Sequence, residues 1–283
     1  MEPLVLILVL AAAVLHASWN ALVKSGGDPW VRLAIANVAC TVVALMLLPF
    51  VGVPAPAAWP FILGSVTIHQ VYFVFVALQY RVGDLSYVYP ISRGAAPLLV
   101  AAAAYVVAGE TLSLAGTLAV MLICGAILSL TFGRPGTWMV GDRRSTLFAL
   151  CTSVTIAAYT LVDGLGGRTT ENVIDYIVYL FLVDSLPFAL LVVFMRRRAL
   201  VPTIRNHWRT GVLGGLLAFL AYGLVIWAMT LSPMTYVSAL RETSVILAAL
   251  IGMRVLKEPF GARRIAAACC VAAGVILLQF SQG

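Results

Sequence analysis

The sequence predicts an all-α protein that crosses a membrane ten times and is built as two inverted five-helix repeats. Three observations lead to this fold class: an apolar composition, ten long apolar runs, and basic residues that gather on alternate connections. Hydrophobic residues make up 62% of the 283 residues and charged residues only 10%, whereas a soluble domain has about 25% charged residues. Too few charges remain to cover a water-exposed surface, and the same composition excludes an intrinsically disordered chain.

Each predicted span is long enough for a helix that crosses a hydrocarbon core about 30 Å thick, which takes about 20 residues. The spans are 3–23, 30–52, 57–80, 84–108, 112–132, 144–164, 172–195, 209–231, 233–254 and 260–281. Barrel strands would instead alternate polar and apolar residues over about ten positions, so long unbroken runs of Ala, Leu and Val favour helices. In the eighth span, Gly211 and Gly215 form a small-xxx-small pair, which is typical of close helix packing.

The Lys and Arg residues predict how the spans are oriented. Fifteen of the 18 lie in connections 1–2, 3–4, 5–6, 7–8 and 9–10, whereas the opposite side, with both termini, holds Arg168 alone. Basic connections stay in the cytoplasm. We therefore expect a multi-pass protein of the cell (inner) membrane, with its odd-numbered loops cytoplasmic and both termini on the outer (periplasmic) side. The net charge of +7 then reflects membrane topology and not a nucleic-acid partner.

The ten spans divide into two halves, residues 1–140 and 141–283, which together form one transmembrane domain. Shifting the chain by 148 residues aligns spans 4–5 with spans 9–10 without a gap. Arg93 then meets Arg241, and Glu110 meets Glu258. Because each half has an odd number of spans, the second copy is inverted in the membrane, as in many transporters.

Three short segments and the ten-span layout make the chain similar to a known family. The segments are Gly109-Glu110-Thr111, its counterpart Lys257-Glu258-Pro259, and the stretch from His16 to Lys24 at the end of the first span. Together they resemble the EamA-type transporters of the drug/metabolite transporter superfamily, and the resemblance covers essentially the whole chain. It implies export or exchange of small metabolites, often amino acids, through a cavity between the two halves.

Two arginines lie deep within predicted spans, where an ionisable group is costly and marks a functional site by default. Arg93 and Arg241 each lie eight or nine residues into a span, a depth of roughly 12–14 Å that is close to the midplane. Guanidinium forks bind a carboxylate or a phosphate bidentately. The alternative is that Asp184 and Glu242 neutralise the two arginines as internal salt bridges.

Other polar and aromatic side chains of the spans complete a predicted substrate site around these four residues. The additional substrate-binding candidates are His16, Trp19, Asn20, His69, Tyr72, Tyr89, Tyr159 and Tyr222. Candidates for proton coupling are Asp184, Glu242, His16 and His69, whose side chains titrate. Pro90, Pro97 and Pro187 lie inside spans, where a proline removes a backbone hydrogen bond and permits a kink.

These features favour a secondary transporter, an exporter or exchanger, of small anionic or zwitterionic metabolites such as amino acids or organic acids. It would work by alternating access through a central cavity, as a monomer or as a homodimer, with the lipid bilayer and a small-molecule substrate as partners. We expect no catalytic residues, cofactor or bound metal. One alternative is a transporter of phosphorylated or phosphonate compounds. Another is an intramembrane hydrolase, although Ser65 and His69 share one helix, whereas a serine protease needs them on different helices.

Overall fold

The computed structural model of the chain describes residues 2–24, 28–83, 85–133, 143–247 and 262–281. These residues form helices, short 3₁₀ turns and connections, which confirms the all-α prediction. The helices are α1 (Pro3–Lys24), α2 (Pro29–Leu47), α3 (Trp59–Val82), α4 (Leu85–Ala108), α5 (Leu114–Ser129), α7 (Arg143–Gly167), α8 (Val173–Met195), α9 (Arg197–Leu231), α10 (Met234–Arg241) and α12 (Ala262–Phe280). The 3₁₀ turns are η1 (Leu48–Phe50), η2 (Pro56–Ala58) and η3 (Leu130–Gly133).

Within the described ranges, seven helices are long and apolar enough to cross a membrane: α1, α2, α3, α4, α7, α8 and α9. Two more apolar helical stretches, α5 and residues Ile265–Phe280 of α12, are shorter than a full span. Large apolar side chains such as Ile7, Val106 and Phe194 are exposed on the outside of the bundle. Exposed apolar faces of this extent fit lipid and not water as the surrounding solvent. The chain is therefore a multi-pass membrane protein.

Residues with short polar side chains, which lie in the connections, cap the N-termini of several helices. The Asp28 carboxylate accepts the N–H groups of Trp30 and Val31 and thereby caps α2, which has a proline at its first position. Ser113 caps α5 and Asn172 caps α8 in the same way. Side-chain oxygens at these positions satisfy N–H groups that the first helical turn leaves unpaired.

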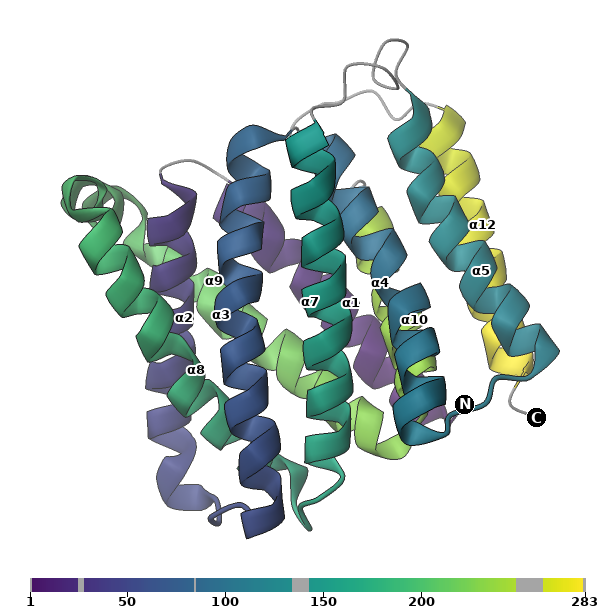
Figure 1. The fold of residues 1–283 in the computed structure, drawn as a ribbon, viewed down its shortest axis with the longest axis horizontal. Coiled ribbons are helices and arrows are strands. Elements are labelled where there is room, and N and C mark those ends of the chain that lie inside the picture. The colour runs from purple at the N-terminus through teal and green to yellow at the C-terminus, as the bar shows by residue number, and fades with distance from the viewer. Residues whose placement is uncertain (1, 25–27, 84, 134–142, 248–261, 282–283) are drawn as a thin grey trace.

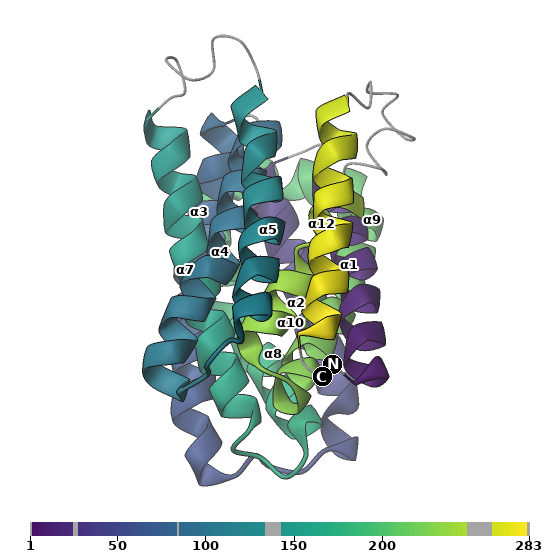
Figure 2. The same cartoon turned by 90° about the vertical axis from the view of Figure 1, so that its right-hand side faces the viewer.

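The helices pack so that each half of the chain contacts the other along most of the bundle. Helix α1 packs on α9, α3 on α7, α2 on both α8 and α9, and α5 on α12. Figures 1 and 2 show that α1 begins and α12 ends at the same end of the bundle. Figure 1 shows α5 and α12 running side by side at one edge of the molecule, and in Figure 2 this pair faces the viewer.

Two elements differ from the prediction. The basic segment 196–208 was expected as a connection, but α9 begins at Arg197 and continues for 35 residues to Leu231. At 1.5 Å per residue this helix is about 52 Å long, well beyond the hydrocarbon core. The ninth span was expected as one continuous helix, but α10 ends at Arg241, a turn follows at Glu242 and Thr243, and the helix resumes at Ser244. The end of that span, residues 248–254, lies outside the described residues.

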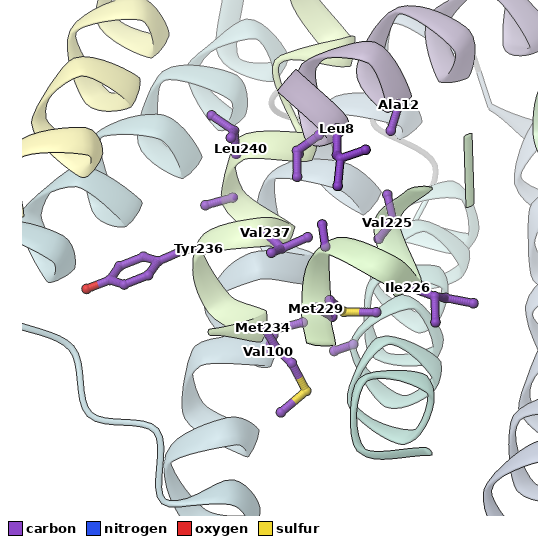
Figure 3. Packing of buried hydrophobic residues seen from close by; sticks show 14 of the residues in the cluster. Leu8, Ala12, Val100, Val225, Ile226, Met229, Met234, Tyr236, Val237 and Leu240 are labelled. Carbon is purple, nitrogen blue, oxygen red and sulfur yellow. The ribbon is translucent and has the colours of Figure 1, made fainter. Parts of the chain in front are cut away.

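The largest apolar cluster of the described residues surrounds the short helix α10. Figure 3 shows Met234 and Val237 of α10 among side chains of its neighbours, with Leu8 on α1 and Val225 and Met229 on α9. All eight residues of α10 are buried. Burial of an apolar side chain contributes about 1.5–3 kcal/mol in water; within lipid, the close fit of such side chains drives helix association instead. The cluster therefore holds α10 in place within the bundle.

Close packing between α2 and α9 depends on glycine. A Cβ atom added at Gly215 would meet the backbone oxygen of Ala36 and lie 2.7 Å from the Cβ of Ala39. Gly211, its partner in the small-xxx-small pair, faces Ile35 in the same interface. The packing role predicted for the two glycines is therefore confirmed.

We expect Gly215→Ala to lower the free energy of unfolding by about 1–3 kcal/mol, because backbone atoms of α2 cannot move aside easily. Gly125→Ala on α5 is the matched control, since an added Cβ there meets nothing within 4 Å. This control should leave stability unchanged or raise it slightly. Thermal unfolding in detergent compares the two variants, and equal midpoints would contradict the packing role of Gly215.

Candidate functional site

The site is built on the broken helix of the ninth span. The Glu110 carboxylate, from the connection between α4 and α5, accepts the N–H groups of Met234 at 3.0 Å and of Thr235 at 3.4 Å. It also forms a salt bridge of 3.1 Å with Arg168 at the end of α7. An anion at a helix N-terminus is stabilising, so Glu110 anchors the start of α10. The opposite end of α10 carries Arg241 into the bundle.

Two arginines share one carboxylate at the break in this helix. The Arg93 Nε atom on α4 lies 2.7 Å from Glu242 Oε2, and the Arg241 Nε atom lies 3.6 Å from Glu242 Oε1. All three side chains are at most 3% exposed. Several nitrogens of both guanidinium groups lack a well-aligned hydrogen-bond acceptor among the described residues. The predicted meeting of Arg93 and Arg241 is thereby found, through Glu242.

The structure corrects two expectations about the carboxylates. On a continuous helix, Arg241 and Glu242 would point about 100° apart and would not need to pair, but Glu242 lies in the turn after α10 and pairs with both arginines. Asp184 was considered as the second neutralising partner. In the described part of the chain it contacts His69 and Gln70 instead. Among the described residues, two cations and one anion therefore meet at the break, and these three side chains together have a net charge of +1.

Asp184 belongs to a separate polar group between α3 and α8. Its carboxylate lies 3.5 Å from His69 Nδ1, and Gln70 Nε2 donates to it at 3.2 Å and to the Asp184 backbone oxygen at 2.9 Å. Asp184 is 4% and His69 6% exposed. The predicted candidates His69 and Asp184 thus form one pair.

Aromatic rings surround His69. The ring centroids of Tyr159 and Tyr222 lie 4.5 Å and 5.7 Å from that of His69, and those of Phe73 and Tyr72 lie 5.9 Å and 6.3 Å from it. The faces of aromatic rings favour a cation. The predicted tyrosines Tyr72, Tyr159 and Tyr222 therefore converge on the histidine.

Asp163 is a buried carboxylate that the sequence analysis did not single out. Its Oδ1 accepts a hydrogen bond from the Tyr176 hydroxyl at 2.9 Å, and its Oδ2 accepts one from the Tyr222 hydroxyl. Asp163 is fully buried, near the end of α7. Because Tyr222 also contacts the His69 ring, Asp163 joins the same acidic and aromatic region as Asp184.

The remaining candidates lie beside Arg93. His16, Asn20, Tyr72 and Tyr89 line with it a small cavity of about 10 Å³, which holds about one water molecule. Within that group, the Asn20 amide donates to the His16 backbone oxygen at 2.8 Å. The Trp19 indole donates to His16 Nδ1 at 3.0 Å, so Trp19 reaches the site through the histidine.

The three prolines lie inside their helices as predicted, Pro90 and Pro97 in α4 and Pro187 in α8. Pro90 and Pro97 flank Arg93 on the same helix. Among the described residues, no three histidine, cysteine or acidic side chains gather as metal ligands would.

We expect Asp163→Ala to lower the free energy of unfolding by about 1–3 kcal/mol for each tyrosine hydroxyl that it leaves unpaired. Thermal unfolding in detergent measures the loss, with Tyr105→Phe as the control because Tyr105 is exposed on the lipid side of α4. Adding Tyr176→Phe to Asp163→Ala should recover part of the loss, since one unpaired hydroxyl disappears. An Asp163→Ala variant as stable as the unmodified protein would contradict the hydrogen-bond assignment.

Comparisons with known proteins agree with this architecture. Residues 143–280 match the profile of the EamA-like transporter family. Solved structures match as well, 28 chains in all. One of these crystal structures superposes with a TM-score of 0.79 at 14% sequence identity, and the alignment covers 98% of this chain and 97% of that chain. At this identity the likeness establishes the fold alone. A search of curated proteins finds no match.

Proposed function

The match over residues 143–280 makes this chain an EamA-type membrane transporter of the drug/metabolite transporter superfamily, and on that premise we propose that it carries small zwitterionic or anionic carboxylates. The proposed substrates are amino acids or organic acids, which an exporter or exchanger would move by alternating access. The carboxylate of the substrate would bind Arg93 and Arg241, and Glu242 would hold the two arginines in place between transport cycles.

The observation that carries this proposal is the unequal charge count at the helix break. Arg93 and Arg241 are buried and share the single carboxylate of Glu242, at 2.7 Å and 3.6 Å. Leaving one positive charge uncompensated away from water is costly, so the protein retains such a charge only where it has a use. A substrate carboxylate supplies the missing anion and matches the planar fork of an arginine.

The size of this excess charge favours a carboxylate over the phosphorylated or phosphonate alternative. One negative charge brings the three-residue cluster to neutrality, whereas a doubly charged phosphate would leave one negative charge uncompensated in the same buried site. Like charges and uncompensated charges are both penalised in a low-dielectric interior. Phosphonates remain in the test below as the competing substrate class.

A group of acidic side chains, opposite in charge to the arginines, supports a zwitterionic substrate in particular. Asp163 and Asp184 contribute two carboxyl groups next to the rings of Tyr159 and Tyr222. The Tyr159 ring contacts the rings of both His69 and Tyr222, which are the partners of Asp184 and Asp163. An α-amino acid presents its carboxylate and ammonium groups to two such groups of opposite charge at once. Proton coupling through Asp184, Glu242, His16 or His69 belongs to the same proposal.

Several packing features support alternating access by two inverted halves, 1–140 and 141–283. In two such copies α1 corresponds to α7, and α3 corresponds to α9. The α1–α9 contact then corresponds to the α7–α3 contact, and both pairs pack closely. The broken helix at Glu242 resembles the discontinuous helices that form midplane sites in transporters. Because the cavity beside Arg93 has room for about one water, a metabolite binds only after the halves separate. The Glu110–Arg168 salt bridge links the halves near the ends of α7 and α9, the side proposed as periplasmic from the basic residues.

The contacts of His69 argue against the intramembrane hydrolase. Ser65 Oγ lies 3.4 Å from His69 Nδ1, and Asp184 Oδ1 lies 3.5 Å from the same nitrogen. A catalytic histidine uses one ring nitrogen for the nucleophile and the other for the acid. Because serine and aspartate compete here for one nitrogen, the trio suits hydrogen bonding within the bundle better than acyl transfer.

Thermal stabilisation of the purified protein tests the substrate class. The panel contains amino acids, organic acids and phosphonates, each compared with a neutral amide or ester analogue. We expect at least one carboxylate to raise the unfolding temperature, and its amide to have no effect. Stabilisation by phosphonates alone would favour the competing class, and equal stabilisation by a carboxylate and its amide would contradict binding at the arginines.

A further inference from the structure

An apolar groove runs along the outside of the bundle between α2, α8 and α9, apart from the substrate site. Its volume is about 440 Å³, and its walls include Val38, Val42 and Met46 of α2, Val193 of α8, and Leu200 and Leu216 of α9. Most of these side chains are exposed. The wall on α2 extends from residue 31 to residue 46, about 22 Å along the helix axis. This length exceeds the depth of one leaflet of hydrocarbon, about 15 Å, so a lipid acyl chain fits along the groove.

One end of this groove is strongly basic. Helix α9 begins there with Arg197 and carries Arg205 and Arg209 further along, and all three are exposed. Arg205 lies seven residues before Val212 and Arg209 lies seven before Leu216, a spacing that places both arginines on the same helix face as groove residues. No acidic residue occurs between Asp184 and Glu242. The basic end therefore has no acidic counterpart on its own helix.

An acidic residue that lies close to this end of the groove is already engaged. Asp28, before α2, caps that helix and lies 3.8 Å from Arg196 Nε. Arg196 also packs over the Trp30 ring. The charges of Asp28 and Arg196 are therefore already paired with each other. Trp208 is half exposed next to Arg209, which lies 5.4 Å above its ring. Tryptophan and arginine together are typical of the level of lipid headgroups.

We propose that this groove binds an anionic phospholipid, with one acyl chain along α2 and the phosphate of the headgroup on Arg205 and Arg209. Charge complementarity selects the occupant: an apolar trough that ends in exposed arginines matches a molecule with an apolar tail and an anionic head. Basic pockets between transmembrane helices bind anionic headgroups in this manner. A second copy of the chain is a poorer match, because the same arginines would meet one another across a symmetric interface.

Retention of lipid by the purified full-length protein tests the proposal. The probes are phosphatidylglycerol and phosphatidylcholine with identical acyl chains, measured by native mass spectrometry, with inorganic phosphate as the headgroup-only control. Phosphatidylglycerol should bind in preference to phosphatidylcholine, and phosphate alone should not compete. Arg205→Gln with Arg209→Gln should weaken phosphatidylglycerol binding about 25-fold, from about 1 kcal/mol for each arginine near the surface.

Two further variants separate the headgroup from the acyl chain. Arg81→Gln with Arg143→Gln removes the same charge from exposed positions on α3 and α7, outside the groove, and should leave lipid binding unchanged. Val42→Trp fills the trough without altering charge and should displace the lipid. Equal binding of the two lipids, equal loss in the two arginine pairs, or unchanged binding in Val42→Trp would overturn the proposal. The proposal would also be overturned if the protein formed a dimer in lipid-free detergent and Val42→Trp dissociated that dimer.

Discussion

Replacing Arg93 or Arg241 by glutamine is expected to weaken binding of the proposed carboxylate substrate by about two orders of magnitude or more. Both guanidinium groups are almost fully buried. Truncating one partner of a buried charge pair costs about 2–5 kcal/mol, and each 1.4 kcal/mol is a factor of ten in affinity. The charge balance of the cluster explains this loss of affinity. Once one arginine is lost, Glu242 neutralises the other, and no positive charge of the cluster remains for the substrate.

Arg81→Gln is the matched control, because it removes one arginine from an exposed position at the end of α3. Arg93→Lys adds a second comparison, since lysine keeps the charge and loses the bidentate fork. It should retain part of the affinity that Arg93→Gln loses. Titration with a stabilising carboxylate gives the affinity of the unmodified protein and of each variant, and an Arg93→Gln variant with unaltered affinity would rule out direct contact.

Glu242→Gln is expected to have the opposite effect to the arginine substitutions: it should destabilise the protein strongly and leave the anion-binding site intact. Without Glu242, two buried arginines face each other with no compensating carboxylate in the described part of the bundle. Removing one member of a buried ion pair typically costs about 3–5 kcal/mol. An added carboxylate substrate should recover more stability in this variant than in the unmodified protein, because it replaces the missing anion.

Combining Glu242→Gln with Arg93→Gln separates charge from packing. If repulsion between the arginines causes the loss, the double variant should be more stable than Glu242→Gln alone, a non-additivity expected of residues in one network. Glu171→Gln serves as the control, since Glu171 is exposed before α8. Thermal unfolding in detergent, with and without substrate, measures each step. A Glu242→Gln variant as stable as the control would contradict the shared-carboxylate arrangement.

The meeting of Arg93 and Arg241 was predictable because a shift of 148 residues aligns their positions in the sequence, whereas the helix break beside Arg241 was not. Helix breaks are usually marked by proline or glycine, and residues 234–247 contain neither. The break is instead associated with tertiary contacts: Glu110 anchors the start of α10, and two arginines from different helices hold Glu242. Contacts between distant parts of a chain leave no local signal in its sequence.

Asp163 was missed because it lies at the boundary of the predicted sixth span, where a charge signals the end of a helix. Helix α7 continues beyond it to Gly167. The glycines that follow Asp163 were the available signal. An added Cβ at Gly166 would lie 2.5 Å from a ring carbon of Tyr176, so the absence of a side chain there lets Tyr176 approach and donate to Asp163.

The basic segment 196–208 was assigned to a connection because of its charge alone. Charge does not oppose helix formation, since arginine, alanine and leucine are all good helix formers. The segment has a proline at position 202, in the second turn of α9, and no glycine before position 211. The helix accommodates Pro202 near its start and meets no glycine that would end it, so helical propensity extends α9 past the hydrocarbon core.

Exchange transport in proteoliposomes tests most directly whether the buried arginines select a carboxylate. Vesicles containing the protein are loaded with the carboxylate that stabilises it best, and uptake of the labelled compound is followed beside that of its neutral amide. We expect rapid exchange of the carboxylate, no exchange of the amide, and no exchange of either by the folded Arg93→Gln/Arg241→Gln variant. Equal exchange of acid and amide, or normal exchange by the double variant, would contradict this expectation.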